Sequence, residues 1–159
     1  MAGRQGLVRW ALGSAVLMAI GAFGPWVKAL GQSVGGTDGS NDGWLVVAAA
    51  AIGGLLFYAT RSTRAAGIWT LLAGAAGLAV TVYDRNNIQN KINQSGAFVK
   101  ALASVGWGLN LALAASASMA LAGLIWVAQT GGQEAALQAP LSAPPVSEPP
   151  PVVSAPPES

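Results

Sequence analysis

Residues 44–60 read WLVVAAAAIGGLLFYAT, a continuous apolar stretch without a charged side chain. A helix needs about 20 apolar residues to cross the hydrocarbon core of a bilayer, and about 17 is the lower limit. Trp44 opens the stretch and Tyr58 lies near its end. Both residue types favour the headgroup region, because an apolar ring carries a polar group. The stretch therefore predicts a transmembrane helix over residues 44–60.

Three further blocks share these properties. None of them contains Asp, Glu, Lys or Arg, so a helix made from each satisfies its backbone without burying a charge. Trp10 and Trp26 bracket the first block, and Trp107 and Trp126 bracket the last. Together the blocks predict an all-α integral membrane protein of the cell membrane. Its multi-pass, four-transmembrane-helix bundle occupies residues 1–128, with spans at about 10–27, 44–60, 65–83 and 105–127.

Composition supports this class and excludes several functions. Hydrophobic residues make up 53% of the 159 positions and charged residues only 9%, whereas about 25% charged is usual in soluble domains. The net charge of +2 is too small and too scattered for a nucleic-acid footprint. Without Cys or His, the chain has no disulfide, no thiolate nucleophile and no ordinary zinc site. We therefore expect no cofactor, no nucleic-acid partner and no enzymatic activity.

The first block has a second interpretation. Arg4 and Arg9 followed by an apolar run, with small residues at 29 and 31, also fit a cleaved signal peptide. The run is longer than the apolar core of most signal peptides, and Gly24-Pro25-Trp26 is typical of a helix that ends at an interface. We favour a retained helix on these grounds.

The basic residues are the basis for predicting the orientation in the membrane. Their numbers on the two sides are equal, so their positions must decide. Four lie on the side of the N-terminus and four on the other side. The flanks of the first helix and the short connections usually decide orientation. Arg4 and Arg9 precede the first span, only Lys28 follows it, and the connection over residues 61–64 is short and basic. We therefore expect both termini to be cytoplasmic.

The connecting segments and the tail differ in kind. Residues 28–43 are rich in Gly, which favours turns. Residues 85–100 carry Ile88, Ile92 and Val99 at near-helical spacing, which predicts a short amphipathic surface helix, although a plain polar loop fits as well. Residues 129–159 hold eight of the nine prolines. This composition predicts a disordered C-terminal tail that is either solvated or docks on a partner with an aromatic groove.

Small residues within the blocks predict close helix packing. Lipid supplies no hydrophobic driving force between helices, so backbones associate where small side chains let them approach. An Asn amide can add a hydrogen bond between helices. The candidate packing residues are Gly13, Gly21, Gly67, Gly74, Gly77 and Asn110.

One segment partly matches a calcium-binding loop. Asp38, Ser40 and Asp42 place oxygen-bearing side chains at alternate positions, which suits a hard cation. The position of the bidentate Glu in such a loop is Ala49, inside the predicted helix. A hydrophilic turn before a helix explains the same residues, so we favour the turn over a metal site.

The chain resembles a widespread set of uncharacterised four-helix membrane proteins from actinobacteria. The likeness covers about residues 7–128 and excludes the tail. It implies a membrane location and this topology, and it implies no activity or ligand. Its motifs are short and Gly-rich, and similar proteins usually have a more apolar residue at Asn110. The likeness rests on the residues Gly21-Ala22-Phe23-Gly24-Pro25-Trp26, Asp42-Gly43-Trp44, Arg61, Arg64, Tyr83-Asp84 and Val105-Gly106-Trp107-Gly108-Leu109.

We therefore expect a non-enzymatic accessory or scaffold subunit. Its partners would be the lipid bilayer and either other membrane proteins, the cell envelope or further copies of itself. The alternative is a small channel or transporter subunit with Asn110, Ser116 and Ser118 along a polar path. The absence of ionisable residues within the spans argues against coupled transport. An enzyme that acts on lipid through loop aspartates is the least favoured hypothesis.

Overall fold

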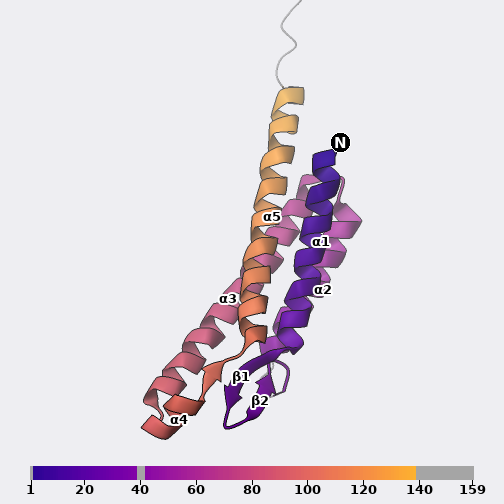
Figure 1. Cartoon of the computed structure of the whole chain (residues 1–159). Helices are drawn as coiled ribbons and strands as arrows, with labels where there is room; N and C mark the ends of the chain where they lie inside the picture. Colours follow the sequence, from indigo (N-terminus) through magenta and orange to yellow (C-terminus); the bar gives the residue numbers. More distant parts are fainter. Residues whose placement is uncertain (1, 39–41, 139–159) are drawn as a thin grey trace, which may run out of the picture.

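The computed structural model describes residues 2–38 and 42–138, which form five helices and three short strands (Figure 1). The helices are α1 (Ala2–Phe23), α2 (Asp42–Thr60), α3 (Arg64–Gln94), α4 (Ala97–Leu102) and α5 (Trp107–Gln138). The strands are β1 (Pro25–Ala29), β2 (Gln32–Gly35) and β3 (Ser104–Val105). Four helices, α1, α2, α3 and α5, are long and apolar enough to cross a membrane. The prediction of four long apolar helices is confirmed.

The limits of the first and third helices differ from the prediction. Helix α1 ends at Phe23, and the expected end at residue 27 is wrong because Pro25 lacks the N–H that the helix would need. Helix α3 runs past Tyr83 to Gln94, since residues 85–94 contain neither Gly nor Pro. The separate helix predicted over residues 85–100 is therefore wrong. Only α4, after the break at Gly96, is a separate short helix.

The C-terminal boundary also differs. Helix α5 continues to Gln138, so the tail does not begin at Gln129 as predicted. Residues 129–138 lack proline, and residues 134–138 are strong helix formers. The first proline of the tail is Pro140. The rest of the predicted tail, residues 139–159, lies outside the described residues.

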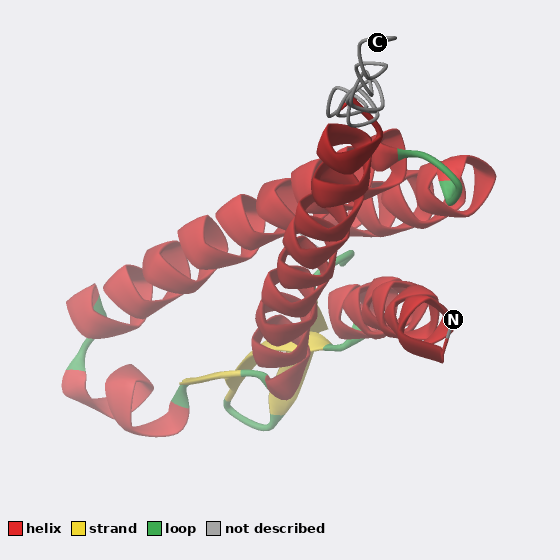
Figure 2. Ribbon diagram, turned by 90° about the horizontal axis from the view of Figure 1, so that it is seen from above, coloured by secondary structure: helices red, strands yellow, loops and turns green. Residues whose placement is uncertain are grey.

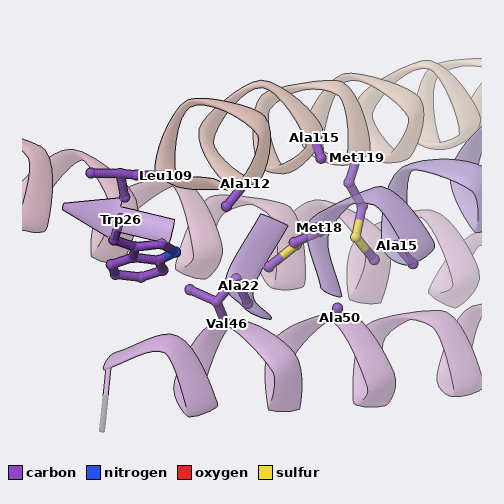
Figure 3. Packing of buried hydrophobic residues seen from close by; sticks show 10 residues of the cluster. All are labelled: Ala15, Met18, Ala22, Trp26, Val46, Ala50, Leu109, Ala112, Ala115 and Met119. Atoms are coloured by element: carbon purple, nitrogen blue, oxygen red, sulfur yellow. The ribbon is translucent and has the colours of Figure 1, made fainter. Parts of the chain in front are cut away.

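The long helices pack on one another in a fixed order. Helix α5 contacts α1 and α3, and α2 contacts α3 and α1. A cluster of buried side chains joins α1, α2 and α5 with Trp26 of β1 (Figure 3). Half of its ten members are alanine, which allows the helices to approach closely. The members are Ala15, Met18, Ala22, Trp26, Val46, Ala50, Leu109, Ala112, Ala115 and Met119.

A second cluster lies nearer the N-terminus. It holds Leu7, Ala11, Phe57, Ala66, Ala122 and Trp126. The rings of Phe57 and Trp126 meet edge to face, with 5.2 Å between centroids. Trp126 is only 2% exposed and Trp26 only 4%. Both were expected at the outer edges of spans, but they pack inside the protein because their indole N–H groups find backbone carbonyls, Thr63 O and Gly21 O respectively.

A small antiparallel sheet, absent from the sequence-based prediction, replaces part of the expected loop. Its strand order is β2-β1-β3, and it lies beside the start of α5 (Figure 2). The hairpin between β1 and β2 turns at Leu30 and Gly31, whose φ angles are 54° and 79°. Positive φ at both central residues is typical of a type I′ turn, which matches the twist of paired strands. Pairing of Val27 with Val105 ties the end of α1 to the start of α5.

Candidate functional site

Four of the candidate packing glycines lie where two helices meet. A methyl group on Gly21 of α1 would overlap the backbone of Ala112 and Gly108 in α5. On α3, Gly67 faces Gly123 and Trp126, Gly74 faces Ala120, and Gly77 faces Ser116 and Met18. Each glycine therefore sets the distance between its helix and a neighbour.

Further glycines have the same role, and two of them, Gly108 and Gly123, were not predicted to pack helices from the sequence. Gly24 and Gly108 contact each other at the junction of α1 and α5, and Gly123 of α5 packs on the backbone of Leu71 in α3. Their spacing along the chain does not distinguish them from solvent- or lipid-facing glycines. Only the direction of the partner helix does so.

Gly13 lacks the helix-packing role predicted for it within the described chain. No described atom lies within 4 Å of a methyl group built on it, and the residue is exposed on α1. It lies on the side of α1 that faces away from α5 and α2, whereas Ser14 and Ala15 beside it are buried. Gly13 therefore packs no helix within the described chain.

Asn110 also departs from its predicted role. Its side chain is exposed, and its Nδ2 donates only a long hydrogen bond of 3.4 Å to Gly106 O of the same chain segment. The predicted bond to a neighbouring helix is not made among the described residues. Ala114 and Ala117, four and seven positions later, are exposed on the same side of α5. An amide beside two small residues thus forms the outer face of α5.

A different polar cluster joins α1 to α5. Trp10 Nε1 donates to Ser118 Oγ at 2.8 Å, and the hydroxyls of Ser14 and Ser118 are 3.0 Å apart. Ser116, by contrast, is buried and donates to Ala112 O. Ser116 and Ser118 point about 200° apart on the helix, while Asn110 is exposed on a third side. The structure therefore does not bring the three residues of the alternative polar path together.

Apart from that of Ser14, the buried hydroxyls described in the long helices are satisfied locally. Those of Thr70, Thr81 and Thr130 each donate to the carbonyl four residues earlier, as Ser116 does. Such bonds leave the hydroxyl without need of water or a ligand. Among the described residues, these groups carry no sign of a hydrated path.

The buried carboxyl group of the described chain belongs to Asp84. The residue is 5% exposed, and its Oδ2 has no hydrogen-bond partner within residues 2–38 and 42–138. The carboxyl of Asp42, in the first turn of α2, lies near it, and two carboxylates this close repel each other. The buried carboxyl thus lies where the start of α2 meets α3.

The predicted metal candidates are not gathered in the described structure. Asp38 Oδ2 accepts a 2.9 Å hydrogen bond from the Gly35 N–H and so closes the turn after β2. Asp42 instead faces Asp84, and Ser40 lies outside the described residues. Within the described ranges, no three acidic, His or Cys side chains converge.

Comparisons with known proteins add no relative. No family model matches the chain, and neither a curated protein nor a solved structure does. The resemblance to actinobacterial four-helix proteins therefore stays a prediction.

Proposed function

We propose that this chain is a non-enzymatic integral membrane protein that acts as an accessory or scaffold subunit. In this proposal α1, α2, α3 and α5 cross the cell membrane, and the protein associates sideways with other membrane proteins. The exterior of the helices supports insertion, because large apolar side chains are exposed along it. Examples are Leu45, Ile52 and Leu55 on α2 and Ile68 and Leu72 on α3.

The arrangement of charge supports the proposed orientation. The N-terminus, the turn between α2 and α3 and the C-terminal part of α5 lie at one end of the molecule (Figure 1). Arg4, Arg9, Arg61 and Arg64 belong to that end. We infer that it is the cytoplasmic end, since basic residues concentrate there in membrane proteins.

The outer face of α5 is the observation that carries the accessory role. Asn110 is exposed there with only a weak bond to its own chain, and Ala114 and Ala117 follow it on the same side. Small residues allow a partner helix to approach, and an amide bonded across helices adds about 0.6–2 kcal/mol. This face therefore suits a second helix better than lipid alone.

Co-purification tests the proposal. The tagged protein, extracted in mild detergent, is expected to carry a stoichiometric membrane partner identified by mass spectrometry. Asn110→Leu is expected to lower recovery of that partner about 3- to 30-fold. Leu55→Ala is the matched control, because it changes an exposed residue of α2 and leaves the α5 face intact.

Two results would overturn the proposal. Equal recovery of the partner with Asn110→Leu and with the wild type would show that the outer face of α5 does not bind the partner. A pure homo-oligomer that conducts ions in liposomes would favour a channel subunit instead.

A further inference from the structure

A pocket of about 680 Å³ opens at the end of the molecule that holds the N-terminus. It lies between the first turns of α1, the connection from α2 to α3, and α5. Its volume falls within the range of about 300–1,000 Å³ that small-molecule sites occupy. The residues around it are Arg4, Gln5, Val8, Arg9, Arg61, Ser62 and Trp126.

Three guanidinium groups give the pocket a strong positive charge. Arg4 and Arg9 come from α1, and Arg61 comes from the α2–α3 connection. Arginine remains charged at any physiological pH. Asp38, Asp42 and Asp84 lie near the sheet, at the far end of the helices, whereas Glu134 belongs to the C-terminal part of α5. The residues that line the pocket include three cations and no anion.

Aromatic rings hold two of these arginines. The Cζ of Arg4 lies 5.0 Å from the centroid of the Trp126 ring, and that of Arg61 lies 4.4 Å from the centroid of Tyr58. A guanidinium that stacks by its face keeps the N–H groups at its edge free to donate. The stacking thus reduces side-chain freedom without consuming hydrogen-bond donors.

Trp126 makes the floor of the pocket rigid. It is 2% exposed, its Nε1 donates to Thr63 O at 3.1 Å, and its ring packs against Phe57. Val8 adds an apolar wall beside it, while Gln5 and Ser62 add neutral polar groups at the rim. The site is therefore preorganised, which lowers the entropic cost of binding.

We propose that this pocket binds the phosphate-bearing headgroup of an anionic phospholipid. The planar N–H fork of arginine matches the geometry of phosphate oxygens, and basic pockets between transmembrane helices recognise such headgroups. The pocket lies at the helix ends, where Tyr58, which stacks on Arg61, is of a residue type that favours the headgroup level. Basic residues are generally enriched at the cytoplasmic ends of transmembrane helices, which explains the presence of arginines at this end. That enrichment does not explain why three of them line one cavity.

Native mass spectrometry of the full chain in neutral detergent tests the site. With phosphatidylglycerol and phosphatidylcholine at equal concentration, we expect the anionic lipid to be retained about 100-fold more, because three arginines contribute. Each arginine is worth about five-fold, the factor that about 1 kcal/mol per basic group corresponds to. Arg4→Gln combined with Arg61→Gln is therefore expected to lower phosphatidylglycerol binding about 25-fold. Lys100→Gln, an exposed cation of α4 at the far end, is expected to change nothing.

A second measurement needs no variant and guards against misfolding. Raising salt from about 0.05 to 0.5 M is expected to weaken phosphatidylglycerol binding to the wild-type chain and to leave phosphatidylcholine unaffected. Inorganic phosphate and glycerol 3-phosphate at ten-fold excess are expected not to displace the lipid. Displacement by either would overturn the lipid as ligand in favour of a soluble phosphate. Equal retention of the two lipids, or an equal loss with Lys100→Gln, would overturn the site.

Discussion

The two ends of this molecule are built in opposite ways. At the sheet end, formed by β1, β2, β3 and the adjoining helix termini, Gly36 and Gly106 meet their neighbours so closely that a methyl group has no room. At the arginine end, formed by the start of α1, the α2–α3 connection and the C-terminal part of α5, Gly3 and Gly6 face open space. Packing is therefore tight around Gly36 and Gly106 beneath the sheet and open beside the first turns of α1.

Charge follows the same division. At the sheet end, the carboxyl of Asp84 is buried near the carboxyl of Asp42 of the same chain. At the arginine end, Arg4 and Arg61 stack on aromatic rings and line an open pocket. The sheet end thus serves the fold, and the arginine end is the one suited to an external ligand.

The largest predicted effect comes from adding a side chain at Gly36, which packs directly against Trp26. A side chain on Gly36 would overlap the Trp26 indole and Ala22 O. Trp26 is itself buried, so it cannot move without displacing its neighbours. Gly36→Val is therefore expected to lower the free energy of unfolding by about 3 kcal/mol. Gly6→Ala, at the arginine end, is expected to raise it by up to about 1 kcal/mol through helix propensity. Thermal unfolding followed by circular dichroism measures both. Equal losses in the two variants would abolish the distinction between the ends.

A smaller effect is expected at the carboxyl pair. Asp84→Asn replaces a buried group whose Oδ2 lacks a described partner with an amide that can donate to Asp42. We expect a gain of about 1 kcal/mol in unfolding free energy. Asp38→Asn is the control, because its oxygen already accepts the Gly35 N–H and should change stability by less than about 0.5 kcal/mol. A loss of stability in Asp84→Asn would show that the charge of Asp84 is needed, as it would be for a bound cation.

The smallest effect is expected at the hairpin turn. Leu30 has φ 54°, a region that costs most side chains about 1–2 kcal/mol but that Asn tolerates. Leu30→Asn is therefore expected to stabilise the protein by about 0.5 kcal/mol, whereas Leu30→Ala keeps the Cβ and should bring no gain. Melting temperatures of both variants provide the comparison. A gain of the same size from Ala would point to the exposed leucine side chain instead of its backbone.

The long helices could be predicted because their signal is local. An uninterrupted apolar run without charge, as in residues 44–60, specifies a helix whatever surrounds it. The sheet has a weaker signal, because its strands are short and β1 pairs not only with the adjacent β2 but also with Ser104–Val105, far away in the chain. The Leu30-Gly31 turn was the local hint, and it is weak because leucine is uncommon at positive φ.

The packing residues could be predicted only in part, for a geometric reason. Gly13 and Gly21 lie on the same helix with similar neighbours, but only Gly21 faces α5. The direction of a partner helix is a tertiary property that no spacing within one helix reveals. The arginine pocket is similar: Arg4 and Arg61 are plain in the sequence, but their approach to Trp126 and Tyr58 requires the fold.

Accessibility from the two sides of the membrane tests the central claim most directly. The chain has no cysteine, so Ser62→Cys at the arginine end and Ser33→Cys at the sheet end each create a single reactive site on an exposed residue. With a membrane-impermeant maleimide on intact cells, we expect labelling of the Ser33→Cys variant alone. The Ser62→Cys variant should react only after permeabilisation. Labelling of Ser62→Cys but not Ser33→Cys would reverse the orientation, and labelling of both in intact cells would contradict a membrane-spanning molecule with its ends on opposite sides.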